Sequence, residues 1–170
     1  MSEIAIPEPS TVADERTTLV QFLDFYRAVL ERKVDGLDEA QVRITVAASS
    51  IDLLGLTRHM ADVERWWFRT VFTGEVDHGR YDDPDDRDAD WHHRPDDTLS
   101  DALSHWHEEV ARAREIVDAT PSLDTIGAVR EVPRGAISLR WILVHLIEEY
   151  ARHVGHADLI REAIDGTTGD

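Results

Sequence analysis

The chain of 170 residues contains no cysteine. This absence excludes disulfide bonds, thiolate metal sites and a cysteine nucleophile. The sequence also has no apolar run that approaches the roughly 20 residues needed for a membrane-spanning helix. Its N-terminus, MSEIAIPEPS, lacks the basic start and the apolar core of a signal peptide. We therefore expect a cytoplasmic protein.

Lysine is almost absent as well, because Lys33 is the only lysine among the 18 basic residues. These face 35 acidic residues, which gives the chain a net charge of −17. Such a surface repels nucleic acids and anionic membranes, and the charge therefore excludes both as partners. The length suits one domain over residues 1–170, with an arm at 1–10 and a tail at 167–170.

Apolar residues recur every three or four positions along most of the chain, which is the period of one helix face. Threonine, serine and aspartate at helix starts and glycine at helix ends fix the boundaries. The expected helices lie at about 11–35, from Ser49 or Ser50 to Gly74, from Thr98 to before Pro121, and from Ser138 to Gly166. Segment 37–50 reads as a crossover with one helical turn, and segment 75–97 as a long polar loop. We predict an all-α four-helix bundle with long connections.

The last helix carries three residues that can bind a metal ion. His145, Glu149 and His153 follow one another at intervals of four and stand on one side of the helix. The outer two are roughly 12 Å apart along the axis, whereas metal–ligand bonds are about 2 Å. One ion therefore takes either His145 with Glu149 or Glu149 with His153. A third ligand must come from another helix, and His59 is the histidine well inside another apolar stripe.

Other candidate patterns fit ordinary structure better. His105 and His107 point to opposite sides of a helix and cannot chelate together. The histidines of 91–93 lie in the polar loop, and the acidic run 82–90 lacks the glycine and glutamate of a calcium-binding loop, so it reads as solvated. Trp66 and Trp67 fit a core or a subunit surface. The sequence has no phosphate-binding glycine loop and no serine nucleophile elbow.

Two long motifs carry a resemblance to a known family. They are LLGLTRHMADVERWWF at 53–68 and LRWILVHLIEEYARHVGHADLIRE at 139–162. Both resemble the DinB-like superfamily, and they are most similar to its uncharacterised branch related to mycothiol-dependent maleylpyruvate isomerase. The resemblance covers nearly the whole chain. It implies a four-helix bundle with up-down-down-up helix order and a divalent metal ion held by three residues.

The resemblance also implies which residues hold the metal. The family's helix-two histidine corresponds to His59, and its last-helix pair precedes a glycine followed by histidine or glutamine. Gly155 and the histidine after it set that register here, so the pair corresponds to Glu149 and His153. This places His145 outside the ligand set, as a packing or supporting residue.

Characterised members of this family use the metal to bind a low-molecular-weight thiol such as mycothiol or bacillithiol as the thiolate, and we expect zinc or nickel as the ion in this chain. The resemblance therefore implies a thiol-dependent S-transferase or isomerase acting on an electrophilic small molecule. We predict no side chain of this chain as the nucleophile, and we expect Arg152 and His156 to lie near enough to contact a substrate anion. The alternatives are a metal-dependent hydrolase and a non-enzymatic, stress-related metal-binding bundle. Aromatic residues outside the His59 stripe, including Trp66 and Phe68, suggest a homodimer.

Overall fold

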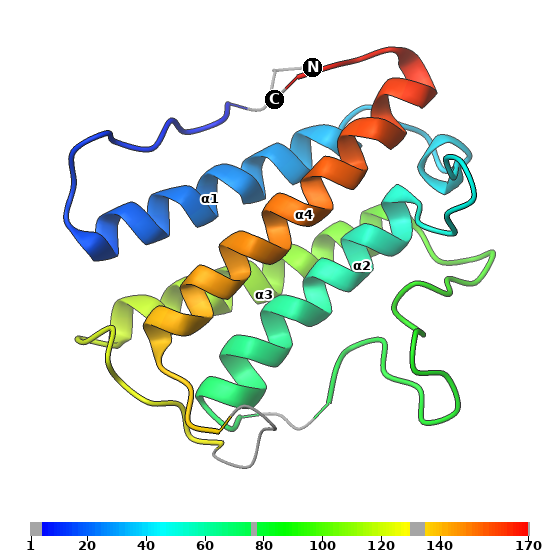
Figure 1. Ribbon diagram of the computed structural model, residues 1–170. Coiled ribbons are helices and arrows are strands. Elements are labelled where there is room, and N and C mark those ends of the chain that lie inside the picture. Colours follow the sequence, from blue (N-terminus) through cyan, green and yellow to red (C-terminus); the bar gives the residue numbers. More distant parts are fainter. Residues whose placement is uncertain (1–4, 76–77, 130–134, 170) are drawn as a thin grey trace. The chain divides into compact units, whose positions relative to one another are not determined.

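The protein is described by a computed structural model at residues 5–75, 78–129 and 135–169. It is all-α, as predicted (Figure 1). Its helices are α1 (Glu15–Val34), η1 (Gln41–Arg43), α2 (Leu53–Glu64), η2 (Arg65–Phe72), α3 (Leu99–Ala119) and α4 (Leu139–Asp165). Over the described residues the only β pairing is two isolated bridges. Four long helices without a sheet are what an all-α bundle requires.

The capping residues confirm most of the expected helix boundaries. The Thr98 hydroxyl accepts a hydrogen bond from the Asp101 amide at 3.1 Å, and the Ser138 hydroxyl accepts one from Trp141 at 3.2 Å. Gly36, Gly74 and Gly166 follow their helices with positive φ angles, the conformation that favours glycine at a helix end.

Two predicted helix starts were wrong. α1 begins at Glu15 and not near Thr11, because Asp14 itself is the cap and accepts the Thr17 amide at 3.0 Å. α2 begins after Asp52, whose carboxylate accepts the Gly55 amide at 2.7 Å, rather than after Ser49 or Ser50. In both cases the cap is an aspartate that lies two or three residues after the predicted hydroxyl residue.

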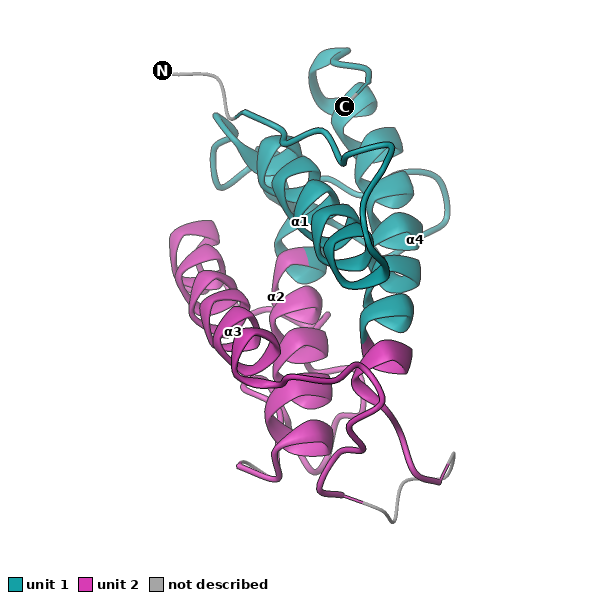
Figure 2. Ribbon diagram, turned by 90° about the vertical axis from the view of Figure 1, so that its left-hand side faces the viewer, with its two compact units in different colours: residues 1–56, 143–170 teal, residues 57–142 magenta. Residues whose placement is uncertain are grey.

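The chain divides into two compact units, coloured separately in Figure 2. The first comprises residues 1–56 and 143–170 and contains α1 with most of α4. Lys33, near the end of α1, pairs with Asp158 at 2.7 Å. Arg161 donates to the carbonyl oxygens of Lys33 at 3.1 Å and Asp35 at 2.8 Å. The C-terminal parts of the two helices therefore lie together, and α1 and α4 run parallel within this unit.

The second unit, residues 57–142, contains most of α2 together with η2 and α3. Arg58, early in α2, pairs with Asp97, which lies just before α3. Glu75, just after η2, pairs with Arg112 in the second half of α3 at 3.0 Å. These helices are therefore also parallel. Parallel first and fourth helices and parallel second and third helices are what the up-down-down-up order requires. That the two units form the single predicted domain stays a prediction.

The segment η2 has a wider turn than an α-helix. The Thr73 amide donates to the carbonyl of Phe68, five residues earlier, at 3.1 Å. Phe68 lies in the core, where it is only 1% exposed, on the same side of the helix as the buried Ala61 and Glu64, while Trp66 is 41% exposed. The prediction that Phe68 is an exposed aromatic was therefore wrong, and Trp66 alone remains of that pair. None of the helices in the described part of the chain is long and apolar enough to cross a membrane.

Candidate functional site

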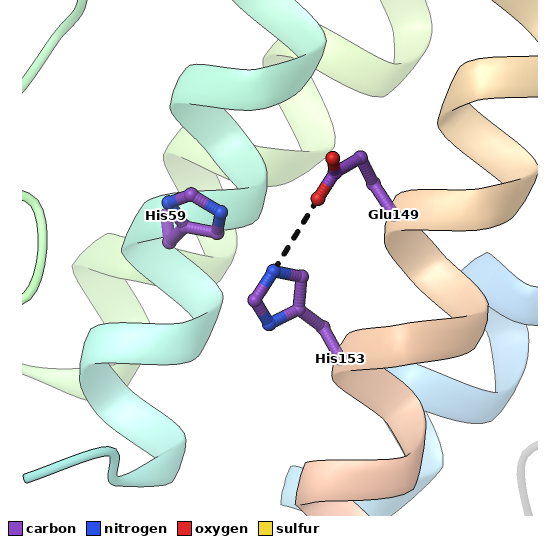
Figure 3. A group of neighbouring side chains, drawn as sticks. All are labelled: His59, Glu149 and His153. Carbon is purple, nitrogen blue, oxygen red and sulfur yellow. Dashed lines mark ion pairs between the residues drawn. The ribbon is translucent and has the colours of Figure 1, made fainter.

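Glu149 and His153 lie one turn apart on α4, beside its buried stripe. Leu146, Tyr150 and Ala157 of that stripe are fully buried, and they hold the helix so that both polar side chains are largely covered. The His153 side chain is 10% exposed and that of Glu149 is 16% exposed. His153 Nε2 lies 3.5 Å from Glu149 Oε2, the contact drawn as a dashed line in Figure 3. The spacing of four residues thus brings an imidazole and a carboxylate together, as predicted.

His145 contacts the same carboxylate from the other side. Its Nε2 lies 3.6 Å from Glu149 Oε1, and its Nδ1 lies 3.2 Å from Glu148 Oε2. His145, Glu148 and Glu149 each offer a ligand atom within 4.8 Å of one another. Both candidate ligand pairs, His145 with Glu149 and Glu149 with His153, are therefore in contact in the first unit. The choice of Glu149 with His153 continues to rest on the resemblance.

Arg152 and His156 lie on α4 beside these residues. Arg152 forms an ion pair with Glu148 and approaches Glu149 Oε1 at 3.5 Å, with its side chain 53% exposed. The pairing of Arg152 with Glu148 is the ordinary contact between residues four apart on a helix. The His156 ring meets the His153 ring edge-on, with centroids 5.5 Å apart. Their expected contact with a substrate anion stays a prediction.

His59 lies on α2 in the second unit, together with two partners that the sequence did not reveal. His59 Nδ1 and Asp90 Oδ2 are 2.6 Å apart, and the Trp91 ring stacks on the imidazole at 4.5 Å between centroids. Asp90 ends the acidic run that was predicted to be solvated. Its side chain is only 18% exposed, so the prediction was wrong for this residue. No periodicity links a loop residue to a helix residue thirty-one positions earlier, so this contact could not be predicted from the sequence.

A pocket of about 230 Å³ opens beside His59 within the second unit. Its wall combines four carboxylates with two indole rings and contains one guanidinium, that of Arg87. The residues concerned are Asp62, Asp82, Asp86, Asp90, Trp66 and Trp67. Negative charge gathered around an aromatic surface disfavours an anionic ligand and suits a ligand with hydroxyl or amino groups that can donate hydrogen bonds.

Asp62 fixes the pocket's loop to α2. Its two carboxylate oxygens accept the backbone amides of Arg80 at 2.6 Å and of Tyr81 at 3.1 Å. Burial raises the pKa of Asp62, against the opposing effect of these two hydrogen bonds. A Cβ atom at Gly79 would lie 2.6 Å from Asp62 Oδ2 and 2.7 Å from Asp82 Oδ1, so both carboxylates would have to shift to accept a larger residue there.

Arg58 and Tyr81 form a second attachment of the loop. The Arg58 guanidinium is buried, donates to the Ala89 carbonyl at 2.9 Å and lies 4.3 Å from the centroid of the Tyr81 ring. The Tyr81 hydroxyl lies 2.8 Å from His105 Nδ1. Burial raises the pKa of Tyr81 to about 12, so the phenol is neutral at physiological pH. His105 thus has a local partner, and its exclusion as a metal ligand stays a prediction.

A buried carboxylate ties η2 to α3 behind this pocket. Glu109 is 1% exposed and accepts hydrogen bonds from Arg65 at 2.9 Å, Arg69 at 3.1 Å and Arg80 at 3.4 Å. Burial alone opposes the charge on Arg69, but the hydrogen bonds and negative charges of Glu109 and Glu75 raise its pKa overall. The arginines hold the start of the pocket's loop and η2 to one anchor on α3.

The geometry defines an all-α chain in which imidazoles and carboxylates project from α2 and α4. Residues 18–166 match the family model described as mycothiol-S-transferase. The chain therefore belongs to this family, and its resemblance to the DinB-like branch related to mycothiol enzymes is confirmed. A search of curated proteins found no match.

Proposed function

We propose that this protein is a metal-dependent thiol S-transferase whose ion is held by His59, Glu149 and His153. Its family membership supports a thiol-dependent transferase. The observation that carries the metal proposal is the Glu149–His153 pair, an imidazole and a carboxylate 3.5 Å apart and largely removed from water. An imidazole and a carboxylate held together in this way are a natural half of a metal site.

The donor set fits a divalent ion. His59, Glu149 and His153 each offer one ligand atom, and two neutral imidazoles with one carboxylate leave a net charge of 1+ on a bound zinc or nickel ion. Three protein ligands also leave a coordination position for a co-substrate. When bound, the ion would lower the pKa of a coordinating thiol, so that the thiol binds as the nucleophilic thiolate.

The absence of cysteine agrees with a borrowed nucleophile. The chain supplies no thiol of its own, so the sulfur that forms the new bond to an electrophilic carbon must belong to a small molecule. The protein's own residues would orient that molecule and keep water away from the reacting atoms. The stacked Trp91 beside His59 supplies part of the apolar surroundings for this.

The pocket beside His59 favours mycothiol among the common small thiols. Glutathione and bacillithiol carry carboxylates, which the aspartates of the pocket would repel. Mycothiol is uncharged and presents the hydroxyl groups of a sugar and an inositol. Those groups can donate hydrogen bonds to Asp62, Asp82 or Asp90, and the sugar ring can pack on Trp66 or Trp67.

Calorimetry with the metal-loaded and metal-free protein tests the proposal. We expect mycothiol to bind only to the loaded form and to release about one proton per thiol near neutral pH. The cobalt-loaded form should develop a sulfur-to-metal charge-transfer band on addition of mycothiol. Binding of glutathione or bacillithiol should be weaker by at least tenfold. If no thiol binds and simple esters or amides are hydrolysed, the protein is a hydrolase. If nothing binds or reacts, it is a non-enzymatic bundle.

A further inference from the structure

Asp90 makes a short polar contact to His59. The two atoms, Asp90 Oδ2 and His59 Nδ1, are 2.6 Å apart, and the side chains are only 18% and 20% exposed. A carboxylate can only accept a hydrogen bond, so Nδ1 must carry the proton. The lone pair of a neutral His59 ring is then on Nε2, the other ring nitrogen.

The position of Asp90 is fixed by contacts between α2 and the residues that precede Asp90 in the loop. Asp62 holds the amides of Arg80 and Tyr81. Arg58 holds the carbonyl of Ala89, the residue next to Asp90. Since Arg58 and Asp62 lie on α2 on either side of His59, the helix that carries the histidine also holds the loop that delivers its carboxylate.

The orientation of the imidazole is fixed as well. The Trp91 ring stacks on it with an interplanar angle of 26°, and the Trp91 amide donates to Asp90 Oδ1 at 3.1 Å. Asp90 Oδ2 thus contacts the His59 ring, while Asp90 Oδ1 accepts the amide of Trp91, the residue that stacks on that ring. This arrangement leaves His59 little freedom to rotate or to exchange its tautomer.

We infer that Asp90 is a positioning residue that prepares His59 for metal binding by fixing the Nδ1–H tautomer and directing Nε2 toward the ion. The inference rests on the proposed function, because it takes His59 as a ligand. Histidines that bind metals commonly donate their second nitrogen to a carboxylate, and loss of that partner weakens metal binding about 10–100-fold. Asp90 would therefore belong to the site without touching the metal.

The first test needs no metal. In the metal-free protein at pH 8, the two ring nitrogens of His59 can be distinguished by long-range ¹⁵N–¹H NMR, with His59→Gln used for assignment. We expect the Nδ1–H tautomer in the wild type and predominantly the Nε2–H tautomer in Asp90→Ala. The Nε2–H tautomer in the wild type, or no change in Asp90→Ala, would overturn the inference.

The second test measures Co²⁺ affinity in the variants Asp90→Ala, Asp90→Asn and His59→Ala. The matched control is Asp85→Asn, which removes one exposed negative charge from the same acidic run. We expect affinity to fall about 10–100-fold in Asp90→Ala and less in Asp90→Asn, whose amide oxygen can still accept from Nδ1. The control should stay within twofold of the wild type. Circular dichroism should show that all variants keep the helical content of the wild type.

The two tests separate failure of the inference from failure of the proposed function. Loss of Co²⁺ binding in His59→Ala with unchanged affinity in both Asp90 variants would refute the role of Asp90 and leave the metal proposal in place. Full Co²⁺ binding in His59→Ala would remove His59 from the ligand set and refute the metal proposal itself. An equal loss in Asp90→Ala and Asp85→Asn would show an effect of net charge and would also refute the role of Asp90.

Discussion

Replacement of Glu109 by glutamine should destabilise the second unit strongly. The Glu109 side chain is fully buried and receives Arg65, Arg69 and Arg80, whose own side chains are 12%, 20% and 28% exposed. Breaking a buried ion pair by removing one partner typically costs about 3–5 kcal/mol. The arginines here reach some water, and the glutamine oxygen can still accept one hydrogen bond. We therefore expect the lower end, about 3 kcal/mol in the free energy of unfolding.

The adjacent Glu108 supplies a matched control. It pairs with Arg80 at 2.6 Å, but its side chain is 58% exposed. Because exposed ion pairs contribute about 0–1 kcal/mol, Glu108→Gln should leave the urea midpoint nearly unchanged. Urea unfolding followed by circular dichroism at 222 nm measures both variants. A loss below about 1 kcal/mol in Glu109→Gln, or equal losses in the two variants, would refute the view that this buried carboxylate anchors η2 to α3.

The remaining predictions concern two glycines, one tyrosine and one exposed tryptophan. Gly79→Ala should lower the free energy of unfolding by about 1–3 kcal/mol, because the added Cβ would lie 2.6 Å from the Asp62 carboxylate. Gly155→Ala should raise the free energy of unfolding by about 0.4–1 kcal/mol, because nothing lies within 4 Å of the added Cβ. Urea unfolding measures both variants. Tyr81 should ionise near pH 12 in a spectrophotometric titration. Because its folded-state pKa is raised, its contribution to stability is complete below pH 10 and is lost between pH 10 and 12, so the wild type should lose more stability over that range than Tyr81→Phe. Light scattering should give about twice the chain mass of 19.3 kDa if the exposed Trp66 face forms the predicted homodimer, and a monomer mass would contradict it.

The helices could be predicted from the sequence because their signals are local. The apolar stripe of α4, from Leu139 to Ile160, repeats with the helix period and is buried as expected. Caps such as Thr98 and Ser138 act within three residues of their partners. The same locality explains the contact between Glu149 and His153, since a spacing of four residues on a helix brings two side chains together.

The missed features depend on contacts between distant parts of the chain or on the width of a buried helix face. Asp90 reaches His59 because Arg58 and Asp62 fasten the loop to α2, and nothing in the acidic run distinguishes Asp90 from its neighbours. Phe68 was misplaced because the buried face is wider than the predicted stripe: Ala61 and Glu64, which lie on the same side of the helix as Phe68, are also fully buried.

Metal content after dialysis tests the central claim most directly. It should be measured for the wild type and for alanine variants of His59, Glu149, His153 and His145 after loading with zinc or nickel. We expect one ion per chain in the wild type and in His145→Ala, and far less than one ion per chain in the other three variants. One ion per chain retained in His153→Ala, together with its loss in His145→Ala, would contradict the proposed ligand set and assign the site to the other pair on α4.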